Sequence, residues 1–231
     1  MAKTILVVGF GPGISTAVAD KFGTSGFSVA LVARNEERLA AGVTALKAKG
    51  VDAAAFPADA ADPTSVRAVV GRARAALGPI GVLHWNATAG SGGAADLLTA
   101  DAAAVRAIFD VPIVGLLAAI QEALPDLKKT GEGAVLITNG AFGELSPQLD
   151  ELAAKTKAMG LALGNAAKHK LVGLLAQRLK GEGVYVGEVM VAGNIKGTAW
   201  DRGNASIDAS TVADRFWELY RARGEVRARV T

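Results

Sequence analysis

Short runs of apolar residues alternate along the chain with longer segments whose apolar positions recur at helical spacing. Residues 4–8 form a short apolar run that ends at glycines, which is typical of a strand buried on both faces. Asn35, followed by two glutamates, predicts the start of a helix, and Pro63 suits the first turn of another. We expect strands at 4–8, 28–33, 51–56, 81–85, 134–138, 184–191 and 225–230, and helices at 14–25, 36–50, 63–77, 101–129, before 180, and at 211–223.

This alternation of strands and helices predicts a parallel sheet with right-handed crossovers. We therefore expect an α/β fold, a Rossmann-type doubly wound parallel sheet of about seven strands in three α/β/α layers. Ligands bind such sheets in the crevice at the carboxyl ends of the strands. No linker or internal repeat divides residues 1–231, so we expect a single domain. Pro112 should interrupt the helix at 101–129, because proline removes a helix hydrogen bond.

Composition excludes several classes of protein. Hydrophobic residues make up 51% of the 231 residues and charged residues 20%, so the chain can bury a core. There is no cysteine, hence no disulfide or thiolate metal site. A net charge of +3 predicts no nucleic-acid partner. Apolar runs such as 111–120 look too short to span a membrane, and the first residues lack a secretory signal, so we expect a cytoplasmic protein with no membrane partner.

The turn after the first strand carries the features of a nucleotide site. It contains Gly9, Gly11 and Gly13, and Ile14 opens the following helix. Glycines allow a tight turn, and the free N–H groups at a helix N-terminus favour an anion such as a pyrophosphate. Position within a repeated strand–helix pattern makes this turn a candidate dinucleotide site.

Arg34 follows the second strand, where NAD-specific proteins carry an acidic residue for the ribose 2′-hydroxyl. A guanidinium can pair with a 2′-phosphate, whereas a carboxylate would repel it. The sequence therefore favours NADP(H) as the cofactor over NAD(H).

Further cofactor contacts are expected after the third and fourth strands. Asp59 and Ala60 follow the third strand, where the aspartate would meet the adenine amino group. Asn86 and Ala87 follow the fourth strand, beside the cofactor. His84 lies inside that strand and is expected to be a hydrogen-bonded core residue.

Together these residues resemble the short-chain dehydrogenase/reductase family over essentially the whole chain. The segment from Gly9 to Ser15 is similar to the family's Gly-x-x-x-Gly-x-Gly turn, with Ser15 in the third glycine position, where a small local shift is expected. Asp59 matches the family's aspartate after the third strand. Residues 85–90 resemble its Asn-Asn-Ala-Gly segment, and residues 191–195 resemble its Pro-Gly-x-Ile turn, which contacts the nicotinamide.

The resemblance implies hydride transfer between a nicotinamide and a carbonyl or alcohol, assisted by a tyrosine, a lysine, a serine and an asparagine. Neither Tyr185 nor Tyr220 is followed by a lysine four residues on. Alignment without gaps puts Leu161 at the tyrosine position and Asn165 at the lysine position. A second register, which needs a three-residue gap, would put Gly164 at the tyrosine position and Lys168 at the lysine position. Gly140 falls at the serine position and Pro112 at the asparagine position. The residues that could substitute in proton transfer are Thr138, Asn139, Lys155, Lys157, Asn165 and Lys168.

Two functions therefore stay open. The first is an NADP(H)-dependent oxidoreductase that moves the proton by a rearranged or water-mediated route and acts on a small molecule that the sequence does not identify. The second is a catalytically silent nucleotide-binding sensor or partner subunit. The family resemblance also implies a homodimer or homotetramer, to which the apolar stretch 113–120 is suited.

Overall fold

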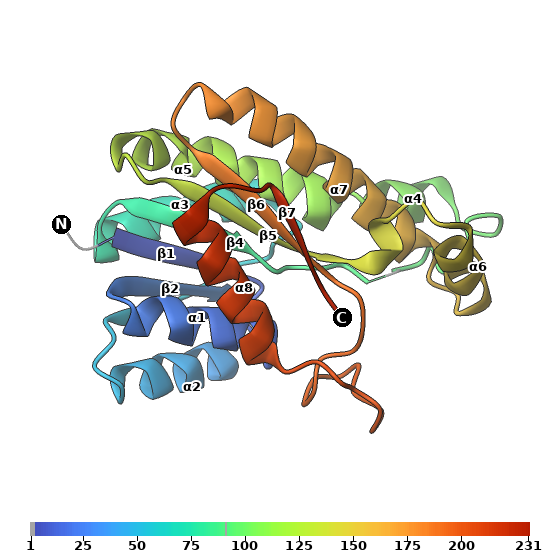
Figure 1. Cartoon of the computed structure of the whole chain (residues 1–231), viewed down its shortest axis with the longest axis horizontal. Coiled ribbons are helices and arrows are strands. Elements are labelled where there is room, and N and C mark those ends of the chain that lie inside the picture. Colours follow the sequence, from blue (N-terminus) through green and yellow to red (C-terminus); the bar gives the residue numbers. More distant parts are fainter. Residues whose placement is uncertain (1–2, 91) are drawn as a thin grey trace.

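Seven strands form one sheet in which every pairing is parallel, in the order β3-β2-β1-β4-β5-β6-β7 (Figure 1). The computed structural model describes residues 3–90 and 92–231. The predicted doubly wound α/β fold is confirmed, with strand ends within two residues of expectation at most positions. The strands are β1 Lys3–Val8, β2 Phe27–Ala33, β3 Ala53–Pro57, β4 Ile80–Trp85, β5 Ala134–Gly140, β6 Tyr185–Val191 and β7 Arg227–Val230.

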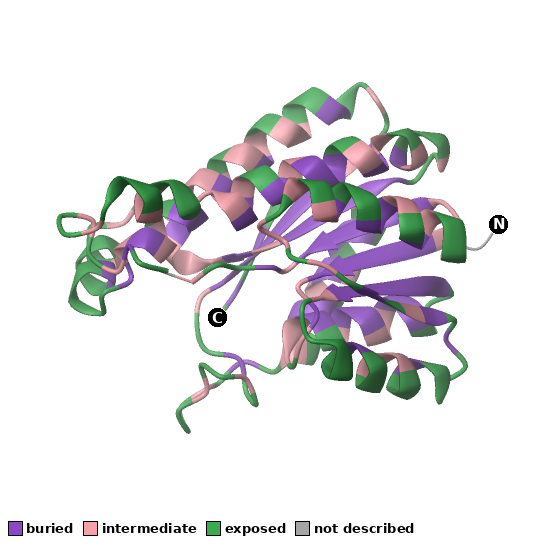
Figure 2. Cartoon of the chain, turned by 180° about the vertical axis from the view of Figure 1, so that it is seen from behind, coloured by how far each residue is buried: buried purple, intermediate pink, exposed green. Residues whose placement is uncertain are grey.

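Helices cover both faces of the sheet, whose residues are almost all buried (Figure 2). On one face α1, α2 and α8 share a hydrophobic core with the sheet, and on the other face α3, α5 and α7 share a second core. The side chain of Asn35 caps α2 and that of Asp62 caps α3. The helices are α1 Ile14–Thr24, α2 Glu36–Lys47, α3 Pro63–Leu77, α4 Ala102–Ala107, α5 Leu116–Lys129, α6 Pro147–Lys155, α7 Met159–Lys180 and α8 Ala209–Ala222.

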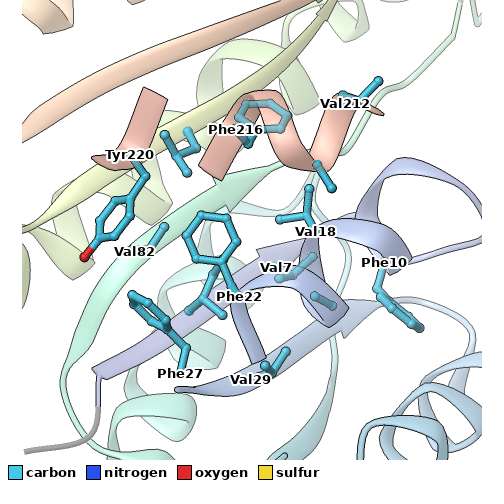
Figure 3. Packing of buried hydrophobic residues seen from close by; sticks show 14 of the residues in the cluster. Val7, Phe10, Val18, Phe22, Phe27, Val29, Val82, Val212, Phe216 and Tyr220 are labelled. Carbon is cyan, nitrogen blue, oxygen red and sulfur yellow. The ribbon is translucent and has the colours of Figure 1, made fainter. Parts of the chain in front are cut away.

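An aromatic cluster joins α1 and α8 (Figure 3). The ring of Phe22 packs edge-on against Phe27 and Trp217, with centroids 5.4 and 5.0 Å apart. Phe216 is fully buried against His84, and Tyr220 lies beside Phe27. The expectation that the aromatics of the last helix are core residues is confirmed.

Pro112 interrupts the long helical region as predicted, but the form of the interruption is a π-helical segment, η1, at Asp110–Gly115. Wide π turns accommodate a residue that cannot donate to the helix ladder. A β-carbon on Gly115 would lie 2.0 Å from the carbonyl oxygen of Ala60, so glycine lets this segment approach the end of β3.

Within the described residues, the helical region Ala102–Lys129 is long and apolar enough to cross a membrane by length and composition. The expectation that no apolar stretch reaches that length was therefore wrong. In the fold this region packs against α3 and β4, and 44% of its most apolar window is buried.

The helical stretch expected before residue 180 consists of two helices, α6 and α7. They are separated at Lys157, whose φ of 56° is left-handed and cannot continue a helix. Two of the C-terminal arginines have partners within the fold. Arg223 lies over the rings of Tyr185 and Tyr220, and Arg229 pairs with Glu144.

Candidate functional site

The predicted glycine turn joins β1 to α1 at the carboxyl edge of the sheet. Gly9 has φ of +85°, and a β-carbon there would lie 2.5 Å from the backbone nitrogen of Ala87. Gly13 has φ of +95°, and a β-carbon there would lie 2.6 Å from the methyl group of Thr198. Both positions need glycine for conformation and for space. The turn therefore brings the ends of β1, β4 and β6 together.

Ser15, in the third glycine position, is fully buried and stabilises the turn. Its hydroxyl accepts a hydrogen bond from Gly11 N at 2.9 Å and donates one to Gly11 O at 3.0 Å. The first helical hydrogen bond of α1 runs from Ala17 N to Gly13 O at 3.1 Å. The N–H groups of residues 14–16 precede this bond and therefore have no acceptor within the helix. They are the donors that the start of α1 offers to an anion.

Two arginines lie at the start of α2, where β2 ends. Asn35 accepts a hydrogen bond from Arg38 N at 2.7 Å, which fixes the first turn of the helix. Arg34 and Arg38 are both exposed, and no described residue forms an ion pair or side-chain hydrogen bond with either guanidinium. Arg38 lies over Gly11, with a terminal nitrogen 3.4 Å from the point that a β-carbon there would occupy. The sequence interpretation singled out Arg34 but missed Arg38, although one helical turn separates them.

The other predicted contacts follow β3 and β4 at the same edge. Asp59 is exposed, and its carboxylate accepts a hydrogen bond from Ala61 N at 3.0 Å. Asn86 donates from its backbone to Val8 O at 2.9 Å and from its side chain to Gly9 O at 3.3 Å. The roles assigned to Asp59, Ala60 and Asn86 stay predictions, but the fold brings these residues to one edge.

A small cavity lies between the segment that follows β4, the η1 region and the start of α7. Its volume of about 10 Å³ is enough for one water molecule at most. Leu161 and Asn165 of the gapless register line it, together with Pro112, whereas Lys168 of the second register does not. A β-carbon on Gly140 would lie 2.8 Å from the side-chain nitrogen of Asn165. The full lining is Thr88, Ala89, Gly90, Ile108, Pro112, Gly160, Leu161, Gly164 and Asn165.

Asn139 holds this region together. Its side-chain nitrogen donates to the backbone oxygen of Asn165 at 3.0 Å and to the carboxylate of Glu188 at 2.7 Å, and its side-chain oxygen accepts from Gly140 N at 3.0 Å. Glu188 is fully buried in β6 and also contacts His169 at 2.7 Å and Arg227 at 3.4 Å. The sequence interpretation missed Glu188, because its partners come from three separate elements.

Most of the other residues considered as proton donors are buried in the core, paired with a neighbouring side chain or exposed on the surface away from the cavity. Burial lowers the pKa of Lys168 to about 8, although the nearby carboxylate of Glu188 opposes this shift. His84 is fully buried and its Nε2 lies 3.2 Å from the hydroxyl of Thr138, which confirms it as a hydrogen-bonded core residue, and this burial lowers its pKa to about 3. Lys155 pairs with Glu151 on the exposed side of α6, and Lys157 is exposed.

The two tyrosines make structural contacts away from the candidate site. The hydroxyl of Tyr185 donates to the backbone oxygen of Glu225 at 2.6 Å, and burial raises the pKa of Tyr185 to about 12. Tyr220 belongs to the aromatic cluster. Neither tyrosine lines the cavity beside Asn165.

A family model described as short chain dehydrogenase matches residues 3–201. The chain belongs to the short-chain dehydrogenase family. Among curated relatives, it is 29% identical over 171 residues to the 3-oxoacyl-[acyl-carrier-protein] reductase FabG of Staphylococcus aureus. That match covers 70% of this chain but only 66% of the reductase, just under two thirds of its length.

Two solved structures share the fold over 99% of this chain and 95% of their own. L-sorbose reductase from Gluconobacter frateurii, complexed with NADPH and L-sorbose, superimposes with a TM-score of 0.85 at 21% identity. A short-chain oxidoreductase from Pseudomonas aeruginosa PAO1, described as NADPH-bound and containing an atypical catalytic center, gives 0.85 at 19% identity. The cofactor of both neighbours is the one predicted here from Arg34.

Proposed function

We propose that this short-chain dehydrogenase binds NADP(H) and transfers hydride between the nicotinamide and a small carbonyl compound or alcohol. The observation that carries the proposal is the pairing of two features at one edge of the sheet. The glycine turn presents helix N–H groups without acceptors, and Arg34 presents a guanidinium without an ion-pair partner among the described residues. A pyrophosphate and a 2′-phosphate are the two anionic groups of NADP(H).

The residues present fit this cofactor. Gly9 and Gly13, where a β-carbon would clash with Ala87 and Thr198, fix the turn in the conformation that offers the N–H groups beginning with Ile14 to the pyrophosphate. Arg34 and Arg38 would hold the 2′-phosphate, while Asp59 would meet the adenine. When bound, the cofactor supplies or accepts the hydride.

In our proposal this protein differs from its family in the groups that supply the proton. The tyrosine and lysine positions hold Leu161 and Asn165, which do not exchange protons at neutral pH, and the serine position holds Gly140. A general acid contributes on the order of a hundred- to ten-thousand-fold in rate. We therefore expect weak carbonyl reduction, with the proton supplied by a water in the cavity beside Asn165. The relative with an atypical catalytic center supports the idea that the fold tolerates such a change.

The alternative function is a silent nucleotide-binding subunit, which the apolar side chain of Leu161 in the cavity favours. The two candidates differ in one measurement. An oxidoreductase consumes NADPH in the presence of some aldehyde, ketone or quinone, whereas a silent binder holds NADPH without oxidising it.

Replacing Arg34 with alanine is expected to weaken NADPH binding by on the order of tenfold to a hundredfold and to leave NADH binding unchanged. A charge-assisted pair with a phosphate contributes about 1.5–3 kcal/mol, and NADH lacks that phosphate. Calorimetric titration of the purified protein with each cofactor measures both effects.

Arg67→Ala is the matched control for Arg34→Ala, because Arg67 is exposed on α3 and bonds to Gln121 away from the site. It should leave both affinities unchanged. Equal binding of NADPH and NADH by the unmodified protein would contradict the role of Arg34. Failure of both cofactors to bind at millimolar concentration would end the proposal itself.

We also propose that the protein is cytoplasmic.

We further propose that the chain associates with copies of itself. Most of the stretch 113–120 is buried within the protomer, so Val114 is its one exposed residue that could contribute to such a surface. This correction follows from its place in the second core, against α3 and β4. The exposed apolar side chains Leu163 and Leu174 of α7, together with Val114, are better candidates for a two-fold interface.

A further inference from the structure

The side chain of Asn165 is a buried amide at the wall of the cavity. It is 6% exposed, and no described residue forms a hydrogen bond with either end of its amide, since the bond from Asn139 goes to its backbone oxygen. Among the described residues that line the cavity, the only other polar side chain is that of Thr88, which is exposed. A buried amide without a partner is unfavourable, so this amide requires an oxygen atom in the cavity.

Two glycines, one at the end of β5 and one three residues later, make room for this amide. A β-carbon on Gly140 would lie 2.8 Å from the amide nitrogen of Asn165, and one on Gly143 would lie 2.8 Å from the backbone carbonyl of the same residue. A side chain on Gly140 would therefore displace the amide. In the gapless alignment, which stays a prediction, Gly140 and Asn165 stand at the serine and lysine positions. Glycine in place of serine thus gives the space that asparagine in place of lysine fills.

The cavity suits one oxygen atom held by this amide. Its volume of about 10 Å³ corresponds to a single water. Ile108, Pro112 and Leu161 form apolar parts of its wall, and no charged side chain is among the described residues that line it. In such apolar surroundings a hydrogen bond is electrostatically stronger than in water. The amide of Asn165 is therefore the buried side chain that can donate to an oxygen at this place.

We propose that the amide of Asn165 donates a hydrogen bond to the carbonyl oxygen of the substrate and stabilises the negative charge which that oxygen gains during hydride transfer. This inference rests on the proposed function. The carbonyl carbon accepts the hydride of NADPH, the electron pair of the C=O double bond moves to the oxygen, and the oxygen then takes a proton from water. NADPH, the carbonyl compound and one proton become NADP⁺ and the alcohol. An amide stays neutral while it donates, so Asn165 acts as a catalytic residue without being an acid.

Asn165→Ala should lower kcat for NADPH oxidation by on the order of a hundredfold to a thousandfold, because a buried donor to a developing oxyanion is lost. The affinity for NADPH should stay nearly unchanged, since the nucleotide turn lies on other elements. Steady-state rates with aldehydes, ketones and quinones measure the first effect, and calorimetric titration measures the second. Gln177→Ala is the matched control, because Gln177 is exposed on the same helix and should change neither. A kcat for Asn165→Ala within a few-fold of the unmodified protein would overturn the proposal.

Asn165→Asp separates hydrogen bonding from shape. The carboxylate repels the developing charge, whereas the protonated carboxyl can donate to it, and burial raises the pKa of a carboxyl. Relative to the unmodified protein, kcat should be at least as low as that of Asn165→Ala at about pH 8 and should rise toward about pH 5. The charged and titratable groups around this part of α7 cancel in that ratio because both proteins share them; they are Lys168, His169, Glu188 and Arg227. A ratio that does not change with pH contradicts the role of Asn165.

Two further measurements distinguish a catalytic amide from a structural one. The side chain of Asn139 forms three hydrogen bonds within the protein and the amide of Asn165 forms none with a described residue, so Asn139→Ala should lower the midpoint of urea unfolding more than Asn165→Ala does. Gly140→Ser should displace the amide and lower kcat, and adding it to Asn165→Ala should cause little further loss. A greater loss of stability in Asn165→Ala, or losses in kcat that multiply, would show that the amide is structural.

The unmodified protein separates this inference from the proposed function. If it binds no NADPH, or oxidises NADPH with no carbonyl compound, the proposed function fails and the role of Asn165 fails with it. NADPH oxidation that is the same in the Asn165 variants defeats this inference alone.

Discussion

Replacing Glu188 with alanine is expected to lower the free energy of unfolding by about 3–5 kcal/mol. The carboxylate is fully buried and contacts Asn139 and His169 at 2.7 Å each and Arg227 at 3.4 Å. Alanine leaves these donors and the nearby charge of Lys168 without a carboxylate, and buried polar groups without partners are costly. Urea unfolding monitored by tryptophan fluorescence measures the loss.

Two further variants separate charge from hydrogen bonding at this position. Glu188→Gln keeps an acceptor for Asn139 but removes the charge, so its stability should lie between those of the alanine variant and the unmodified protein. Glu218→Ala removes an exposed carboxylate that pairs with Arg215, and it should cost less than about 1 kcal/mol. A loss in Glu188→Ala no larger than that in Glu218→Ala would show that the buried carboxylate is dispensable.

Loss of Glu188 should also change the positions of residues that line the cavity. Asn139 joins Glu188 to Gly140 N and to the backbone oxygen of Asn165, so the carboxylate helps to fix both walls of the candidate site. The residues of the nucleotide turn and of α2 lie on other strands and helices and, among the described residues, form no hydrogen bond with this cluster. We therefore expect Glu188→Gln to leave NADPH affinity nearly unchanged.

The strands were predicted well because they depend on local patterns, and the same patterns placed the candidate nucleotide residues at one edge of the sheet, where their roles stay predictions. Runs of apolar residues define the parallel strands, and Asn35 caps its helix through a bond to a residue three positions away. Gly9 and Gly13 were recognised from a turn whose residues are contiguous. Their steric reasons, the backbone of Ala87 and the methyl group of Thr198, come from distant segments and appear only in the fold.

The residues around the cavity beside Asn165 could be predicted only in part. Leu161 and Asn165, which the alignment put at the tyrosine and lysine positions, both line one cavity, since α7 runs without a break through them; the alignment itself stays a prediction. The burial of Lys168 was not foreseen, because a lysine at helical spacing is usually solvated. Nor did any local signal show that Glu188, in the middle of an apolar strand, would gather partners from β5, α7 and β7.

Lys168→Met is expected to raise the free energy of unfolding by about 3 kcal/mol at pH 7. Burial lowers the pKa of Lys168 from its ordinary value of 10.5 to about 8, and each pKa unit corresponds to about 1.4 kcal/mol. Between pH 8 and 10.5 the unfolded chain therefore binds more protons than the folded chain at this position. The penalty is complete below pH 8 and vanishes above 10.5, so the advantage of methionine should shrink across that window.

Urea unfolding of both proteins at pH 7 and pH 10 measures this difference, and the other titrating groups cancel when the variant is compared with the unmodified protein at each pH. Lys170→Met is the matched control, because Lys170 is exposed on the same helix and should change stability by less than about 0.5 kcal/mol at either pH. If Lys168→Met is destabilising at pH 7, attraction to Glu188 outweighs desolvation of the ammonium. The two residues would then form a net stabilising buried pair, and Lys168→Met combined with Glu188→Ala would cost less than the sum of the single changes.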